Sequence, residues 1–255
     1  MRAPITTGMI LVALFSADIP TAGAREALKI AVAANVRYAF DELEAAFRRE
    51  TGIEATGVFA SSGKLTAQIM NGAPFDVFLS TDLEYPDRLH RAGYAADPPA
   101  IYAYGALVLW TLTGLDLTPG VQALAAPGVA RVAYANPRLA PYGRAAEEAL
   151  AYYGILDAVR AKAVSGESIS QVNQYIHSRN VDAGFTAKAV VRSPAMRGAG
   201  RWIEVPRDAY RPIAQGAVVL KHGADTAAGD CARFVEFLAS APARAILADY
   251  GYTLP

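Results

Sequence analysis

Through residues 28–80, short apolar segments alternate with helical patterns, and no other feature of the sequence constrains the fold as strongly. Three of these segments are short and lack polar alternation, as buried strands do: 28–34, 53–59 and 75–80. Between them, apolar residues recur at helical spacing up to Thr51-Gly52, and a second helix is expected over 64–70. This β-α-β-α-β order predicts an α/β fold with a mainly parallel sheet and helices on both faces.

The alternation of strands and helices ends at a long apolar strand expected over 104–111. A stretch containing Gly and Pro follows this strand. We interpret this strand as the crossing into a second lobe, and the apolar strand expected over 214–220 as the return. The second lobe should hold strands at 129–134 and 181–185 and helices at 144–152 and 166–179. Two terminal helices, expected at 227–238 and 242–250, would pack on the first lobe. The predicted division is one lobe from 25–110 plus 213–255 and a second from 111–212.

The amino terminus has the order of a secretory signal. Arg2 precedes the apolar run Met9–Phe15, and small residues end at Ala22-Gly23-Ala24, which is typical of a cleavage site. A buried helix is the alternative, but Pro4, Gly8 and Pro20 disfavour it. We therefore expect residues 1–24 to be a signal peptide, and the mature protein to begin at Arg25 in the periplasm.

Composition excludes several classes of partner. Lys and Arg number 24 against 24 Asp and Glu, without a basic run, so binding to nucleic acid is not expected. The single cysteine, Cys231, cannot form an internal disulfide and is expected to be a small buried side chain. Three histidines lie far apart in the sequence, so no site for a metal cation is expected: His90, His177 and His222.

Three loops lie where a strand should hand over to a helix, and each offers small or hydroxyl residues: 33–35, 60–63 and 136–143. Helix amino termini expose unpaired N–H groups, so loops of this kind that meet at one cleft form an anion site without cationic side chains. Each loop alone could be an ordinary helix cap. Tyr142 could be a core aromatic, but Pro141 and Gly143 keep it in a loop, which favours a role in the site.

Catalytic motifs are not supported. Ser62-Gly63-Lys64 suggests a phosphate loop, but that pattern needs Gly where Val58 stands and Ser or Thr where Leu65 stands. No serine has the surroundings of a G-x-S-x-G elbow. We therefore expect no catalytic residues and no enzymatic activity.

Five segments together resemble the periplasmic molybdate-binding proteins of ABC uptake systems, in order and over essentially the whole mature chain: 33–35, 59–63, 72–80, 136–143 and 246–254. The resemblance implies a two-lobed periplasmic binding protein of class II, the Venus-flytrap type, in which each lobe is a mainly parallel sheet flanked by helices. It implies molybdate or tungstate as ligand, held between the lobes without a cofactor, and an ABC permease of the inner membrane as partner. A monomer is expected.

The resemblance also implies a ligand-binding set. The first-loop donor of the family falls at Asn35 beside Ala34, and its second-loop serine falls at Ser62 beside Ser61. Two further residues would donate through their backbone amides: Tyr142 and Ile169.

This chain departs from the family at two positions, because Asn35 stands where the family has Ser and Ala187 stands where it often has a donor Tyr. We expect the Tyr142 hydroxyl to replace that phenol.

Donors alone suit a fully deprotonated tetraoxo dianion, whereas phosphate carries a proton that needs an acceptor. Three alternatives remain open at this point. The ligand could be sulfate, phosphate or another small oxyanion, or the chain could be an exported α/β enzyme. It could also be a membrane-anchored adaptor without a small ligand.

Overall fold

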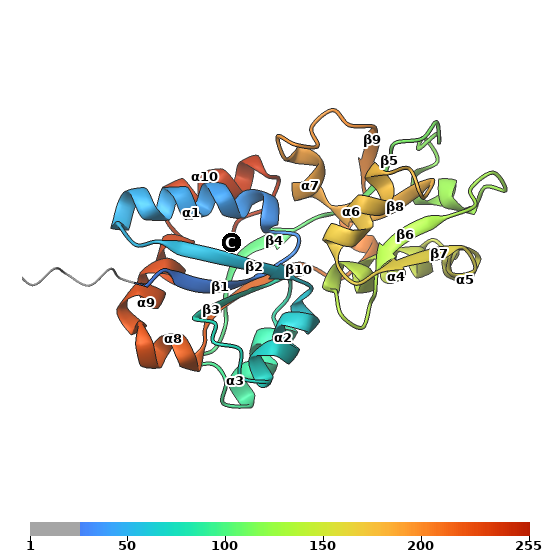
Figure 1. Ribbon diagram of the computed structural model, residues 1–255. Coiled ribbons are helices and arrows are strands. Elements are labelled where there is room, and N and C mark those ends of the chain that lie inside the picture. Colours follow the sequence, from blue (N-terminus) through green and yellow to red (C-terminus); the bar gives the residue numbers. More distant parts are fainter. Residues whose placement is uncertain (1–25) are drawn as a thin grey trace, which may run out of the picture.

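Two lobes lie side by side in the computed structural model, which describes residues 26–255 (Figure 1). Each lobe contains a five-stranded sheet with helices around it. The expected signal peptide at 1–24 lies outside the described residues. None of the helices within residues 26–255 has the length and hydrophobicity of a membrane span. The predicted α/β architecture of two lobes is confirmed.

The sheet of lobe 1 has the strand order β2-β1-β3-β10-β4, and its strands are β1 Leu28–Ala33, β2 Ala55–Ala60, β3 Val77–Ser80, β4 Ala100–Gly105 and β10 Ile213–Val219. Strand β1 pairs in parallel with β2 and β3, whereas β10 is antiparallel to both β3 and β4. The sheet is therefore mixed, and its one reversed strand is the strand that enters from the other lobe.

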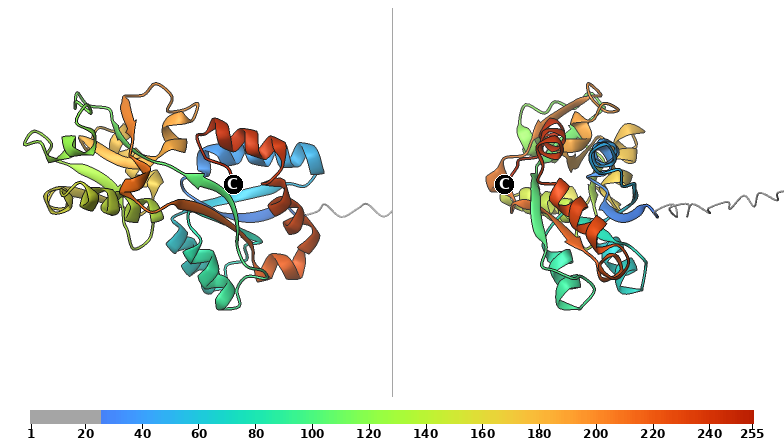
Figure 2. Two further views of the ribbon diagram at one scale, coloured as in Figure 1. Left: turned by 180° about the vertical axis from the view of Figure 1, so that it is seen from behind. Right: turned by 90° about the vertical axis from the view of Figure 1, so that its left-hand side faces the viewer.

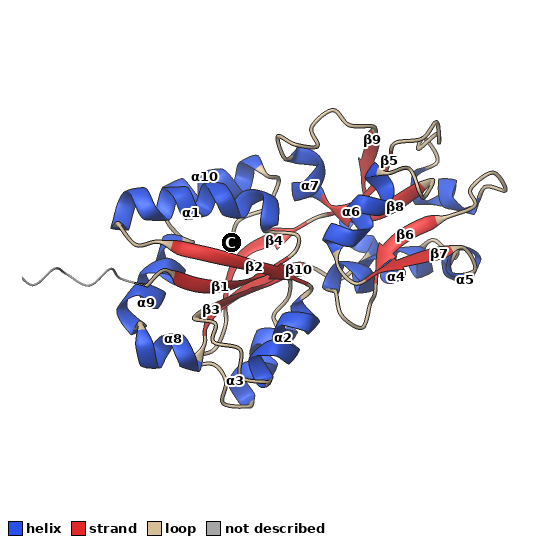
Figure 3. Cartoon of the chain, in the orientation of Figure 1, coloured by secondary structure: helices blue, strands red, loops and turns tan. Residues whose placement is uncertain are grey.

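Helices cover both faces of this sheet, which explains why its strands are apolar without alternation (Figure 3). The helices of lobe 1 are α1 Arg37–Thr51, α2 Ser62–Met70, α3 Glu84–Arg91, α8 Lys221–Thr226, α9 Ala228–Phe237 and α10 Ala241–Asp249. Ile30 and Val32 pack with the cluster under α1, α9 and α10, while Ala31 between them packs with the cluster under α2 and α3. This alternation follows from the two-residue period of a strand.

Helix α1 illustrates how the local sequence sets these elements. Its buried face carries Phe40, Leu43 and Phe47, and each such side chain contributes about 1.5–3 kcal/mol on burial. The Phe47 ring meets that of Phe234 on α9 edge-on, with centroids 5.0 Å apart. Gly52 ends the helix in the left-handed conformation at φ 71°, where a side chain would be strained.

Lobe 2 repeats the plan. Its strand order is β7-β6-β8-β5-β9, with β5 Leu107–Thr111, β6 Val132–Ala135, β7 Ala163–Gly166, β8 Ala183–Ala187 and β9 Arg201–Glu204. Its α-helices are α4 Pro141–Tyr152, α5 Leu156–Arg160, α6 Ile169–His177 and α7 Lys188–Arg192, and 3-10 helices lie at Gly120–Ala125 and Arg207–Ala209. Here β5 is the reversed strand, since it is antiparallel to both β8 and β9.

The expected single strand over 104–111 is wrong. It is two strands, β4 and β5, which belong to different sheets and are separated by Ala106. The end of β4 is half-buried and β5 is fully buried, but no charged or strongly polar residue falls between them, so the hydropathy pattern shows no break. The return crossing leads into β10, which pairs with β4 from Ile213 opposite Gly105 onward. Figure 2 shows both connections between the lobes in the view from behind.

The helix expected over 166–179 is shorter, because residues Ala163–Gly166 form the edge strand β7 and α6 begins at Ile169. The helix expected from Arg144 begins three residues earlier, at Pro141, where proline suits the first helical turn. Cys231 is fully buried, as expected, and burial raises its thiol pKa to about 12. The expectation that Pro141 and Gly143 keep Tyr142 in a loop is wrong, because all three residues lie in the first turn of α4.

Candidate functional site

One small cavity lies between the lobes, and all six predicted site residues line it: Ala34, Asn35, Ser61, Ser62, Tyr142 and Ile169. Its remaining lining residues are Thr81, Ala140 and Pro141. The cavity volume is about 10 Å³, whereas a site for an organic ligand usually measures ~300 Å³ or more. The cavity is therefore far too small for an organic ligand.

Three helices begin at this cavity. Helix α2 starts at Ser62, α4 places Tyr142 at its second position, and α6 starts at Ile169. None of the three has a side-chain cap. The backbone N–H groups of Ser62, Tyr142 and Ile169 donate to no group among residues 26–255, whereas those of Gly63 and Gly143 are already bonded to Leu139 O and Ala140 O. The positive ends of the three helix dipoles meet there, and no lining residue is charged. The site thus attracts an anion through neutral groups alone.

Two serine hydroxyls add to these amides. The Ser62 Oγ accepts the N–H of Thr81 at 3.0 Å, which leaves its own proton free to donate into the cavity. The Ser61 Oγ is buried and has no hydrogen-bond partner among the described residues. Ser61 lies between β2 and α2 and Ser62 is the first residue of α2, so the junction of strand and helix positions the two serines together.

The hydroxyl of Tyr142 is also buried without a partner in the described chain. Burial raises the pKa of Tyr142 well above its ordinary value, with smaller contributions from Tyr252, Tyr210 and Tyr102. The phenol therefore stays protonated and able to donate. Its oxygen lies beside the end of β4, where a Cβ on Gly105 would be only 2.3 Å away.

Asn35 differs from the serines, because its side-chain amide is fully hydrogen-bonded to other residues of the protein. Its Nδ2 donates to Gln215 Oε1 at 2.8 Å and to the Tyr252 hydroxyl at 3.1 Å, and its Oδ1 accepts the Thr81 hydroxyl at 2.7 Å. These three partners were missed by the sequence analysis. Thr81 directly follows the strand β3, so its place at the end of a strand was a signal that could have revealed it.

Contacts across the cleft show that the lobes are closed. Gly63 N–H donates to Leu139 O at 2.9 Å, and the Tyr85 hydroxyl donates to Arg138 O at 2.9 Å.

An ion pair across the same cleft joins Arg144 on α4 to Asp82, the residue after Thr81. Burial raises the pKa of Asp82, and the Arg144 guanidinium opposes that shift. The cavity is thus enclosed by contacts that separation of the lobes would break.

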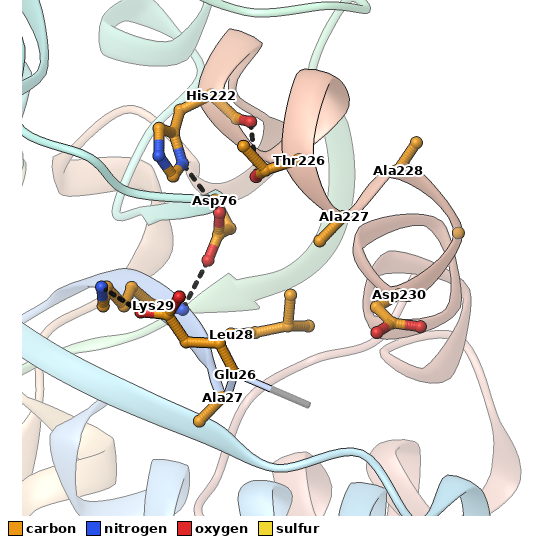
Figure 4. Close-up of a pocket in the computed structure, with 11 residues that line it drawn as sticks. Glu26, Ala27, Leu28, Lys29, Asp76, His222, Thr226, Ala227, Ala228 and Asp230 are labelled. Atoms are coloured by element: carbon orange, nitrogen blue, oxygen red, sulfur yellow. Dashed lines mark hydrogen bonds and ion pairs between the residues drawn. The ribbon is translucent and has the colours of Figure 1, made fainter. Parts of the chain in front are cut away.

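A larger cavity of about 470 Å³ lies at the opposite edge of lobe 1, near the start of β1 (Figure 4). There the Asp76 carboxylate accepts the backbone N–H of Lys29 at 2.7 Å and pairs with Nδ1 of His222 at 3.0 Å. These bonds tie the starts of β1 and α8 to the segment before β3. In α/β sheets, ligands bind at the carboxyl ends of the strands, which is where the small cavity lies and the larger one does not.

The chemistry of the small cavity is that of an anion receptor. Residues with hydroxyl groups and backbone amides line it, and its lining contains no carboxylate, histidine or cysteine. A fully deprotonated oxyanion is satisfied by donors alone, whereas a protonated one leaves its O–H without an acceptor. Two α/β lobes that close over such a cavity define a two-lobed solute-binding protein.

Comparison with known proteins agrees with this class. The family of bacterial extracellular solute-binding proteins matches residues 28–253, and the chain belongs to this family.

The relatives include two proteins named molybdate-binding protein ModA. That of Azotobacter vinelandii is 34% identical over 96% of this chain and 97% of its own length. That of Rhodobacter capsulatus is 38% identical over 87% of this chain and 86% of its own length. The solved structure of the Azotobacter vinelandii periplasmic molybdate-binding protein superposes with a TM-score of 0.84 at 34% identity, and the match covers 89% of this chain and 99% of that one.

Proposed function

We propose that this protein is a periplasmic receptor that captures molybdate and delivers it to an ABC importer. The observation that carries the proposal is the convergence of three uncapped helix N-termini on a small cavity without charged side chains. The relatives at 34% and 38% identity, both named for molybdate binding, support the choice of ligand. The permease of the importer would receive the ion when the lobes open.

The proposed donors are the hydroxyls of Ser61, Ser62 and Tyr142 and the backbone amides at the cavity, including that of Ile169. Ala34 would form part of the wall beside Asn35. Each hydrogen bond to a charged ligand contributes about 1.5–3 kcal/mol, so a few of them are sufficient for tight binding. No cofactor or metal cation takes part, and the protein acts as a monomeric binding protein without catalysis.

Tungstate is the second proposed ligand, since it is also a tetraoxo dianion and makes the same demands on the donors. Sulfate is the principal competitor, because it too is deprotonated at neutral pH. Phosphate is disfavoured, since the cavity lining has no carboxylate to accept its proton. The ligand's size must decide between molybdate and sulfate.

A melting scan in the presence of EDTA tests the proposal. Molybdate at a hundredfold excess over Kd should stabilise the fold by about 2.7 kcal/mol, because it binds the native state alone. Sulfate and phosphate should stabilise it much less at equal concentration. A scan in which sulfate equals or exceeds molybdate would refute the assignment of the ligand while leaving the anion site in place.

A pair of serine variants tests the site. Ser62→Ala should weaken molybdate binding by about 1.5–3 kcal/mol, because it removes a buried hydroxyl donor. The matched control is Ser178→Ala, at the exposed end of α6 remote from the cavity, which should bind as the unaltered protein does. Equal affinities for the two variants would exclude Ser62 as a ligand.

Export is the remaining part of the proposal. The intact mass of the exported protein should correspond to a chain that begins at Arg25. A mass that retains Met9–Phe15 would contradict removal of the signal peptide.

A further inference from the structure

A buried polar network lies beside the cavity and consists of Asn35, Thr81, Gln215 and Tyr252, which we name the Asn35 network. All four residues are buried, with side-chain and backbone atoms linked at 2.7–3.2 Å. Of the four, Asn35 and Thr81 line the cavity itself, while Gln215 and Tyr252 lie outside its lining. The network therefore connects the cavity to parts of the fold that cannot reach the ligand.

The bonds of Asn35 show what is left for a ligand. Both Nδ2 protons have acceptors in Gln215 and Tyr252, and Oδ1 accepts from Thr81. The Tyr252 hydroxyl also donates to the backbone oxygen of Asn35 at 3.1 Å. An amide side chain has two donor protons, so none remains for the cavity. The network instead fixes the orientation of the peptide at Asn35, whose N–H donates to no group within residues 26–255.

The network joins segments far apart in sequence. Tyr252 lies on the C-terminal tail, which the neighbouring Thr253 anchors to β4 through two backbone bonds with Tyr104, of 2.7 and 2.9 Å. Gln215 lies on β10 at a register shift, and its Nε2 donates to Thr81 O at 3.2 Å. Thr81 in turn donates its N–H to Ser62 Oγ at 3.0 Å. These hydrogen bonds thus connect the cavity residues Asn35, Thr81 and Ser62 with strand β10 and with the C-terminal tail.

We infer that Tyr252, Gln215 and Thr81 are positioning residues for oxyanion binding, which hold the Asn35 peptide and the Ser62 hydroxyl in the geometry that the ligand requires. The C-terminal tail is then part of the binding apparatus although it does not touch the ligand. This inference rests on the proposed function and extends it to Thr81 in the cavity lining and to Gln215 and Tyr252 outside it. A hydrogen-bonded ligand is sensitive to small displacements of its donors, so loosening the network lowers affinity without unfolding the protein.

The chain offers a matched pair of variants to test the tail. Tyr252→Phe removes the hydroxyl that binds Asn35, whereas Tyr250→Phe removes a hydroxyl two residues earlier that donates to Glu42 on α1 at 2.7 Å. Both variants keep the ring and lose a buried or half-buried hydrogen bond. Titration calorimetry should show a molybdate Kd raised about tenfold for Tyr252→Phe and changed less than twofold for Tyr250→Phe. A purely structural role would lower both melting temperatures and leave both Kd values unchanged.

Thr81 provides a rescue experiment. Thr81→Val keeps the backbone N–H that binds Ser62 but loses the hydroxyl that binds Asn35, whereas Thr81→Ser keeps both. The Val variant should bind about tenfold more weakly, and the Ser variant should bind within twofold of the unaltered protein. Equal affinity of Thr81→Val and the unaltered protein would overturn the inference for Thr81.

The unaltered protein, titrated with molybdate and sulfate alongside the variants, separates the two possible failures. Binding of sulfate instead of molybdate would refute the proposed ligand, and the same variants titrated with sulfate would still decide the positioning role. Binding of neither ion would refute both. Normal affinity of Tyr252→Phe for whichever ion binds would overturn the inference alone.

Discussion

The hydroxyl of Tyr142 allows a test in which affinity and stability should move separately. Its oxygen is buried without a partner among the described residues, so its removal costs no hydrogen bond within that part of the protein. If the hydroxyl donates to the bound anion, Tyr142→Phe removes one hydrogen bond to a charged group, worth about 1.5–3 kcal/mol. That loss corresponds to a Kd raised about 10- to 150-fold.

The ring of Tyr142 is unchanged in this variant, and the melting temperature of the ligand-free protein should stay the same or rise. An unsatisfied buried hydroxyl is unfavourable, and Phe does not carry one. The control is Tyr134→Phe, a buried tyrosine of lobe 2 whose hydroxyl lies 3.4 Å from Glu147, away from the cavity. It should lose a little stability and keep its affinity for molybdate.

Isothermal titration of both variants, combined with melting scans without ligand, measures the two effects. An affinity of Tyr142→Phe within twofold of the unaltered protein, together with a large loss for Ser62→Ala, would refute the role of the phenol. Tyr142 would then contribute only its backbone amide, and no residue would replace the tyrosine that the family often has where Ala187 stands.

Three further predictions concern a close contact at Gly105, the ion pair between the lobes and the buried thiol of Cys231. Gly105→Ala should destabilise the protein by about 1–3 kcal/mol, because its Cβ would lie 2.3 Å from the Tyr142 oxygen and 2.9 Å from Gln215 Nε2. Tyr142→Phe in the same chain should recover part of this loss in a denaturant titration, since it removes only the first of these contacts. Arg144→Gln should weaken molybdate binding about fivefold, since it removes the cross-lobe ion pair with Asp82; unchanged affinity in calorimetry would show that the pair does not favour closure. Stability should fall between pH 9 and 12, because the folded protein holds the Cys231 proton that the unfolded chain releases above pH 9, and Cys231→Ala should make this fall shallower in urea titrations.

Local patterns were sufficient to predict the architecture. Short apolar runs followed by helical periodicity identify parallel strands covered on both faces, because such strands have no solvent-facing side to carry polar residues. The change from strand to helix in the sequence also predicted a turn at Ser61 and Ser62. These two residues lie at the start of α2, where the first backbone N–H groups of a helix are free to donate. Hydropathy could not divide residues 104–111 into β4 and β5, because no charged or strongly polar residue separates them and the two strands differ in the sheet that each joins.

The surroundings of Asn35 were decided by the tertiary structure alone. The sequence placed this residue in the first loop, and its type suggested a side-chain donor, but its amide is occupied by partners that lie 46, 180 and 217 residues away. Thr81, Gln215 and Tyr252 share no motif or spacing with Asn35, and only the pairing of β10 and the tail with the rest of lobe 1 brings them together. Periodicity and loop composition report on neighbours within a few residues, whereas a buried hydrogen bond depends on where distant strands meet.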